Sequence, residues 1–333
     1  MDEELNITID PACLRLEAPL ALDIIMQLDT FGLCLYSMLS FMSLLTLLLY
    51  LEQCVYIYKK LPYPKKISII WISGASPVVA TMACCGMWVP RAVMITDMTS
   101  NCYFAVVVYK VLALLIEELG GMRDFLQRFS GKTFRINTGP CCCCCACLPR
   151  VPVIFSSYLG MLFLMKLGSM QYAVLKTVFS ILSVILWMNG TFHLTNLNIN
   201  SAMIWINPFV GVLLVISIWP IGIVFMNTKI LMRSLKIIPK YALYQLTLVL
   251  CQLQTSIINI LALNGCIACA PPLTSYARGS MLSQQILIME MFIISLFTRS
   301  LYRRLYDPLP SEEHDNEQNE KAALKAALEE HDV

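Results

Sequence analysis

Charged residues are scarce in this sequence. Asp, Glu, Lys and Arg make up 14% of its 333 residues, whereas a soluble domain typically has about 25%. The formal net charge is only +2, so the chain lacks the strongly basic character that nucleic-acid binding requires, and no nucleic-acid partner is predicted. Hydrophobic residues account for 58% of the chain, which indicates an integral membrane protein.

Histidines and catalytic motifs are also lacking. The three histidines lie outside the long apolar segments. Ser130–Thr133 reads SGKT, but the first glycine of a phosphate-binding loop is replaced by Leu126. Neither an H-E-x-x-H nor a G-x-S-x-G motif occurs. The sequence therefore predicts no enzyme, no cofactor and no metal site, and its acidic first residues predict no cleaved signal peptide.

Long apolar runs are what the sequence does have. A helix needs about 20 mostly apolar residues to cross a bilayer core of about 30 Å. By that measure we expect an all-α membrane protein, a bundle of seven transmembrane helices within residues 31–298. The expected spans are 31–51, 67–88, 98–116, 167–188, 204–226, 241–263 and 281–298. Pro77 lies inside the second span and should kink it.

Lysine and arginine are unevenly distributed between the loops, and this bias predicts the orientation. They are concentrated after the first, third, fifth and seventh spans, whereas the alternate loops hold only Arg91 and Arg278. The amino-terminal segment 1–30 is therefore expected outside the cell, and the acidic carboxyl-terminal tail 299–333 in the cytosol. Glycosylation sequons at Asn6 and Asn189 fall on the expected outer side.

A dense run of cysteines lies in the expected cytosolic loop 117–166. The run consists of Cys141, Cys142, Cys143, Cys144, Cys145 and Cys147. Disulfides are rare in the reducing cytosol, and adjacent side chains point too far apart to close together on one zinc ion. Cytosolic cysteines beside a membrane are typical S-palmitoylation sites, so we expect acyl chains to hold this loop on the inner leaflet. Zinc binding is the alternative.

A second cysteine pattern, the C-x-x-C of Cys266 and Cys269, lies on the expected outer loop before the seventh span. A disulfide from this pair to Cys102, or to Cys84 or Cys85, is one interpretation, because the extracellular side is oxidising. The other interpretation is that these small side chains pack between helices.

Three ionisable side chains fall inside the expected spans, where a charge is costly and therefore usually functional. Lys176 and Glu290 lie near mid-depth, and they could pair with each other or line a polar path. Lys110 lies slightly to the cytosolic side of the middle of the third span, and Glu117 and Glu118 mark the cytosolic end of that span. We expect Lys176, Glu290 and Glu117 to belong to a solute pathway.

The sixth span carries a polar stripe. Gln245, Gln252, Ser256 and Asn259 are seven, four and three residues apart, so they should share one helical face. The stripe is either a wall of the solute pathway or a set of hydrogen-bonding groups that hold the bundle together.

Several short motifs resemble the alpha subunit of the organic solute transporter family. They occur in the order expected for that family, from about residue 50 to residue 305. The motifs are VYIYKK at 55–60, CCGMWVPR at 84–91, TGPCCCCC at 138–145, QYAVLK at 171–176, WIN at 205–207, NGCIACAPP at 264–272 and TRSLYRR at 298–304. Lys110 and Ala146 depart from the family pattern, and the acidic tail does not match it.

The resemblance implies a seven-helix carrier of bile acids, conjugated steroids and similar amphipathic anions. It implies facilitated diffusion together with a small single-span beta subunit, in the basolateral plasma membrane of epithelia. Membrane lipid is a further expected partner through the acylated loop, and a higher oligomer is compatible with the same pattern. In such a carrier Lys176, Gln252 and Asn259 could meet the anion of the solute. The alternatives are a seven-helix receptor that signals through a cytosolic partner, and a lipid-organising structural protein.

Overall fold

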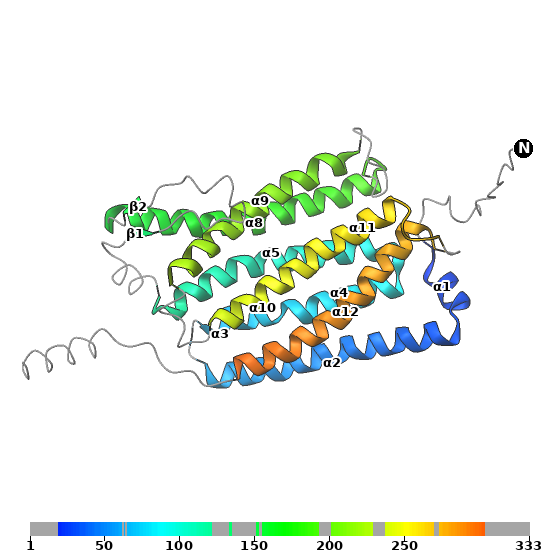
Figure 1. Cartoon of the computed structure of the whole chain (residues 1–333), viewed down its shortest axis with the longest axis horizontal. Coiled ribbons are helices and arrows are strands. Elements are labelled where there is room, and N and C mark those ends of the chain that lie inside the picture. Colours follow the sequence, from blue (N-terminus) through cyan, green and yellow to red (C-terminus); the bar gives the residue numbers. More distant parts are fainter. Residues whose placement is uncertain are drawn as a thin grey trace, which may run out of the picture.

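The structure is a computed structural model, and it describes residues 19–61, 63, 65–121, 133–134, 151–152, 155–192, 201–228, 237–269 and 273–303. Long helices run side by side along the longest axis of the molecule (Figure 1). Seven helical segments among the described residues are long and apolar enough to cross a membrane. The prediction of seven transmembrane helices in an all-α bundle is therefore confirmed, with one two-stranded sheet added to it.

The helices extend past the apolar runs into the polar residues that flank them. Their bounds are α1 Ala21–Gln27, α2 Thr30–Lys60, α3 Lys65–Ser73, α4 Ala75–Trp88, α5 Val93–Glu118, α8 Phe155–Met188, α9 Ala202–Thr228, α10 Ile237–Val249, α11 Thr255–Leu263 and α12 Ser275–Tyr302. A 3-10 turn, η2 (Pro90–Ala92), precedes α5, and a π-helical segment, η4 (Leu250–Gln254), joins α10 to α11. A hydrogen-bonded helix satisfies its own backbone in lipid, which explains why every span takes this form.

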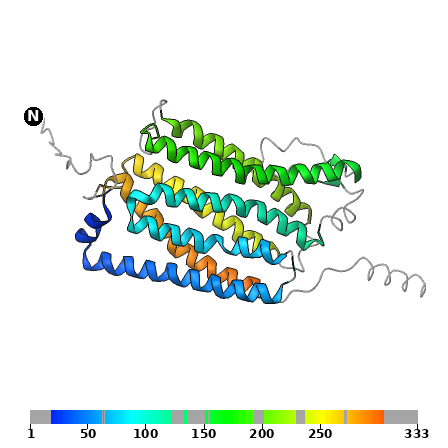
Figure 2. The same cartoon turned by 180° about the vertical axis from the view of Figure 1, so that it is seen from behind.

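Helix α5 lies between the two halves of the bundle. On one side it packs against α4, which in turn packs against α12 and α2. On the other side it packs against α8, with α9 beyond (Figures 1 and 2). The largest apolar core surrounds α5, where Ala105, Val108 and Leu112 are fully buried. The outward faces of α2, α8 and α9 expose large apolar side chains, as helices in contact with lipid do.

The second span is broken as Pro77 predicts, but at Gly74, between α3 and α4. Proline clashes with the carbonyl four residues earlier and cannot donate to it, so the disturbance falls near Ser73. Hydroxyl groups from neighbouring helices approach this break: Tyr103 donates to the Trp71 carbonyl at 2.9 Å, and Tyr50 donates to the Ile70 carbonyl at 3.3 Å. A side chain at Gly74 would collide with the Tyr103 hydroxyl, so the close approach requires glycine.

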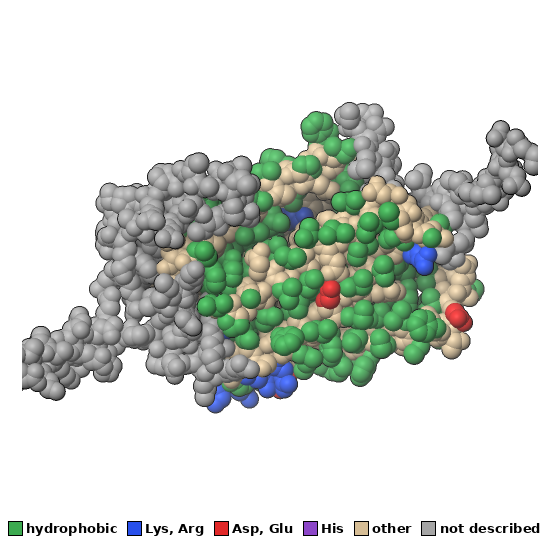
Figure 3. Space-filling view, viewed as in Figure 1, with side chains coloured by type: hydrophobic (Ala, Val, Ile, Leu, Met, Phe, Trp, Pro, Cys, Tyr) green, Lys and Arg blue, Asp and Glu red, His purple; other side chains and the backbone are tan. Residues whose placement is uncertain are grey.

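The two ends of the bundle differ in charge. We call the end at which α2, α5 and α12 finish the basic end. Its described basic side chains are Lys59, Lys60, Lys65, Lys66, Lys166, Lys240, Arg299 and Arg303. Figure 3 shows such side chains gathered where α2 and α12 finish. The described residues at the opposite end include only the basic side chains Arg91 and Arg278.

The cysteine run lies between two short strands at the basic end. β1 (Thr133–Phe134) and β2 (Val151–Pro152) pair antiparallel, with Phe134 opposite Val151. This pairing brings the two sides of the cysteine-rich segment together just before α8 begins at Phe155. The expected lipidation sites themselves lie outside the described residues.

Candidate functional site

Lys176 occupies the middle of a membrane span. It lies 13 residues after the start and 12 residues before the end of the apolar part of α8, Phe163–Met188. Its side chain is partly buried and lies within electrostatic reach of Cys102 on α5. It makes no ion pair with any acidic side chain that the structure describes. A cation without an acidic partner is costly at this depth, so Lys176 is a candidate functional residue.

Gln252, on the π-helical segment η4, contacts α5 beside Cys102. Its Nε2 donates a hydrogen bond of 2.7 Å to Oδ1 of Asn101, the residue before Cys102. Residues 101–102 thus bring Lys176 and Gln252, which are far apart in the sequence, to one short segment of α5. In Figure 3 a basic side chain lies in a hollow between the α8–α9 side of the molecule and the α10–α11 side.

The expected polar stripe of the sixth span is not one uniform face. A π turn widens the helix and adds a residue, so positions before and after η4 lose the constant α-helical register. Gln252 bonds to α5, whereas the exposed Ser256 donates to the backbone carbonyl of Gln252 at 2.6 Å. The Oε1 of Gln245 is enclosed and accepts no hydrogen bond from the described part of the chain, and Asn259 is partly buried. Ser256 is thus more exposed than the other three residues, and the shared face stays a prediction.

Glu290 lies in the middle of α12, 15 residues after Ser275 and 12 before Tyr302. Its carboxyl group lies near Gln254 of η4, and its Oε2 is enclosed and accepts no hydrogen bond from the residues that the structure describes. It forms no ion pair with Lys176: α8 packs against α5 and α9, whereas α12 packs against α2, α4 and the α10–α11 segment. One acidic side chain stands out within the largely hydrophobic face of Figure 3.

Another polar contact inside the bundle was not foreseen from the sequence. Asp97 of α5 accepts a hydrogen bond of 2.8 Å from Nε2 of Gln284, which is buried on α12. Asp97 escaped notice because the third span was expected to start at Met98, one residue later. The contact joins α5 and α12 toward the opposite end of the bundle.

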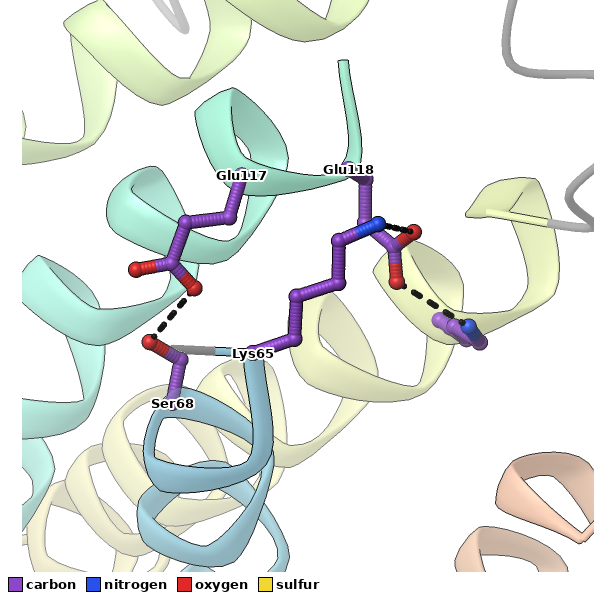
Figure 4. Close-up of polar contacts among 5 residues, drawn as sticks. Lys65, Ser68, Glu117 and Glu118 are labelled. Carbon is purple, nitrogen blue, oxygen red and sulfur yellow. Dashed lines mark hydrogen bonds and ion pairs between the residues drawn. The ribbon is translucent and has the colours of Figure 1, made fainter. Parts of the chain in front are cut away.

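Glu117 is tied to α3 at the basic end. Ser68 donates a hydrogen bond of 3.1 Å to its Oε2 (Figure 4). The neighbouring Glu118, which also marks the end of the third span in the sequence, is the more enclosed acid and has two basic partners. Lys65 of α3 donates to its Oε2 at 3.2 Å, and Lys240 of α10 lies 3.7 Å from its Oε1 (Figure 4). Glu118 therefore connects three helices.

A disulfide between Cys266 and Cys102, one of the interpretations left open by the sequence, is not formed, because both side chains are free thiols in the structure. Cys102 lies inside the bundle near Lys176, and Cys266 is exposed. Cys84 and Cys85 are free thiols as well. Cys269 is disulfide-bonded.

Two kinds of site remain to be located, the glycosylation sequons and groups of residues that could bind a metal ion. Asn6 lies outside the described residues, and Asn189 is exposed directly after α8, at the opposite end from the basic end. No group of three or more His, Cys, Asp or Glu side chains that could hold a metal ion occurs within the described ranges.

We compared the sequence of this chain with protein families and with known proteins. The family model "Organic solute transporter Ostalpha" matches residues 35–308. The organic solute transporter subunit alpha of Danio rerio is 56% identical over 325 residues, covering 97% of this chain and 98% of that protein. The subunit alpha of Leucoraja erinaceus is 37% identical, with 94% of this chain and 87% of that protein covered.

The relationship extends to mammals. The subunit alpha of Homo sapiens is 33% identical over 300 residues, which cover 90% of this chain and 87% of that protein. No solved structure matches. The matches describe a subunit of a solute transporter and not an enzyme. The chain belongs to the organic solute transporter alpha-subunit family, as its sequence motifs predict.

Proposed function

We propose that this chain is the alpha subunit of a heteromeric carrier for bile acids, conjugated steroids and related amphipathic organic anions. The solute crosses by facilitated diffusion, so its concentration gradient sets the direction. The observation that carries the proposal is Lys176, a cation at the centre of a span with no acidic partner among the described residues. The anionic group of a solute would supply the missing charge, and a hydrogen bond to a charged group contributes about 1.5–3 kcal/mol.

Further polar groups line the proposed pathway around this anion site. The amide groups of Asn101 and Gln252 bond to each other beside Cys102, so they present a polar wall without an opposing charge. Gln245 and Glu290 each keep an enclosed oxygen that accepts no hydrogen bond from the described side chains. Hydroxyl groups on a steroid are suitable donors to such oxygens. Asn259 and Ser256 follow on α11, and we assign them to the outer part of the same pathway.

The steroid body needs apolar surface along its route. The exposed residues of α8 and of the α10–α11 segment, such as Val174, Val178, Leu253 and Ile257, are apolar. An amphipathic solute can therefore keep its rings against lipid and apolar side chains while its anion meets Lys176.

The orientation, lipidation and partner belong to the same proposal. We assign the basic end to the cytosol because of its excess of lysine and arginine, which leaves the amino terminus outside. S-acylation of Cys141–Cys145 and Cys147 then holds the loop between β1 and β2 on the inner leaflet. A small single-span beta subunit completes the carrier, in the basolateral plasma membrane of epithelial cells. Glu117 lies at the cytosolic mouth in this arrangement.

Uptake of a radiolabelled steroid sulfate tests the proposal. Cells that express the chain with a beta-type subunit should take up the compound, and Lys176→Ala should lower uptake at least about tenfold at equal surface expression. Lys176→Arg should retain most uptake, because it keeps the charge. Lys166→Ala is a matched control on the same helix at the basic end and should transport normally. Unchanged uptake by Lys176→Ala would remove the anion role of this residue, and binding without uptake would favour a receptor.

A further inference from the structure

A small cavity lies near the basic end, between α3, α4, α5, α10 and α12, and away from Lys176. It has two adjoining parts of about 30 Å³ each, which share Ile72, Lys240, Tyr244 and Tyr302 in their walls. The remaining walls are mostly apolar, from Val111, Leu114 and Leu115 on α5 and Ile294 on α12. Each part has room for a few waters at most, so a larger occupant requires the helices to separate.

Two polar groups face this apolar space. Tyr244 is 5% exposed, and its hydroxyl forms no hydrogen bond with any residue that the structure describes. A buried hydroxyl without a partner is unfavourable, so it is ready to donate to an acceptor that enters the cavity. Lys240 lies in the first turn of α10, with its Nζ 5.1 Å from the centre of the Tyr302 ring.

Lys240 can exchange its acidic partner Glu118 for another anion. Its Nζ is 3.7 Å from Oε1 of Glu118, whereas Lys65 donates to the other oxygen of that carboxylate at the shorter distance of 3.2 Å (Figure 4). If Lys240 turns to another anion, Lys65 still neutralises Glu118. The exchange therefore leaves no acid unpaired in a poorly solvated place.

The helices that enclose the cavity are joined in a way that permits opening. α10 packs against α12. It contacts α5 through side chains: the rings of Phe104 and Tyr244 are stacked, with their centres 6.2 Å apart. The Lys240–Glu118 pair is the ion pair between α5 and α10 within the described part of the chain. Releasing Lys240 from Glu118 thus removes the charged contact that holds α10 over the cavity.

We propose that this cavity is a second solute site at the basic end, at which the anionic group of an amphipathic steroid conjugate displaces Glu118 from Lys240. The Tyr244 hydroxyl donates a hydrogen bond to the same ligand, and the apolar ring system lies against Ile72, Val111 and Tyr302. This inference rests on the proposed function, because the carried anion is a ligand whose charge and apolar rings match the chemistry of these walls. It assigns α10 the role of the element that moves when the site fills.

Direct binding of tritiated pregnenolone sulfate and of uncharged tritiated pregnenolone to the purified complex with the beta-type subunit tests the site. Lys240→Met should weaken binding of the sulfate about tenfold and leave pregnenolone binding unchanged. Glu118→Gln should tighten sulfate binding, because it removes the competing carboxylate. Tyr244→Phe, which keeps the ring, should weaken sulfate binding severalfold. Lys66→Met is the control, since Lys66 lies at the same end over the Tyr58 ring, outside the cavity.

The outcomes separate this site from the proposed function. Sulfate binding by Lys240→Met and Glu118→Gln equal to that of the unchanged protein would overturn the second site, even if Lys176→Ala abolishes uptake. Equal losses of sulfate and pregnenolone binding in Lys240→Met would also overturn it, because only a structural defect affects both ligands. Absence of steroid uptake by the unchanged complex would instead overturn the proposed function.

Discussion

Gln252 donates a hydrogen bond of 2.7 Å to Asn101, and this contact joins the π-helical segment η4 to α5 in the middle of the bundle. Interhelical hydrogen bonds in membranes contribute about 0.6 kcal/mol on average and at most about 1.7 kcal/mol. We therefore expect Gln252→Leu and Asn101→Leu each to lower stability by about this amount, and the double variant to lose no more than either single one. Thermal unfolding of the purified protein in detergent measures the effect as a double-mutant cycle.

The same pair of variants separates the two interpretations of the polar stripe. If Gln252 only holds helices together, steroid sulfate uptake per molecule at the surface should not change. We expect uptake to fall several-fold in Gln252→Leu, because the amide also belongs to the proposed anion site. Ser37→Ala on α2 is the control, since this exposed hydroxyl bonds to its own helix outside the proposed pathway, and an equal loss of uptake in this variant would contradict our assignment of Gln252.

Gly74 should tolerate no side chain. A Cβ at this position would collide with the Tyr103 hydroxyl and lie 3.0 Å from the Tyr50 hydroxyl. We expect Gly74→Ala to cost about 1–3 kcal/mol of stability, as overpacking of a core usually does. Thermal unfolding and the fraction of protein that reaches the cell surface both measure the loss.

A second substitution shows whether the Tyr103 hydroxyl causes this loss. Tyr103→Phe combined with Gly74→Ala should recover part of the stability, because the clashing oxygen is gone. Gly168→Ala and Gly211→Ala are matched controls within helices, since nothing lies within 4 Å of the added carbon at either position. If all three glycine variants unfold at the same temperature, the Tyr103 hydroxyl does not lie close enough to Gly74 to exclude a side chain.

The sequence was sufficient to predict the seven spans, because the length of an apolar run decides whether a helix crosses a bilayer. It also predicted the break caused by Pro77, although the position of the break, Gly74, depends on a clash with the preceding turn. The π turn at η4 could not be predicted, because a single extra residue within a continuous helix leaves no mark on hydrophobic periodicity.

The candidate sites were predictable only as separate positions. Lys176 and Gln252 stood out because ionisable and amide side chains are rare in spans, but their common neighbour Asn101–Cys102 depends on how three helices pack. Asp97 and Glu118 lie at the ends of α5, where charged residues are ordinary in a sequence. Only their partners, Gln284 for Asp97 and Lys65 and Lys240 for Glu118, show that they are enclosed.

The cysteine run should carry fatty acyl chains. Replacing Cys141–Cys145 and Cys147 by serine should abolish labelling with a clickable palmitate analogue. Cys54→Ser, in a partly buried position on α2, is the control and should leave labelling unchanged. Persistent labelling of the variant without the cysteine run would refute this assignment.

The basic end should face the cytosol. An epitope tag inserted beside Cys147 should bind antibody only after cells are permeabilised, whereas a tag near the amino terminus should bind on intact cells. The reason is the excess of lysine and arginine at the basic end. Staining of the tag beside Cys147 on intact cells would reverse the orientation and remove the basis for inner-leaflet acylation.

Flux through the purified complex is the most direct test of the central claim, that the chain carries steroid anions past Lys176. Proteoliposomes with the alpha chain and a beta-type subunit should exchange a radiolabelled steroid sulfate saturably, in the direction set by its gradient, and faster when unlabelled sulfate is present on the other side. Proteoliposomes with Lys176→Ala should lose at least about nine-tenths of this flux. Specific binding of the sulfate without flux by the unchanged complex, or full flux by Lys176→Ala, would contradict the account.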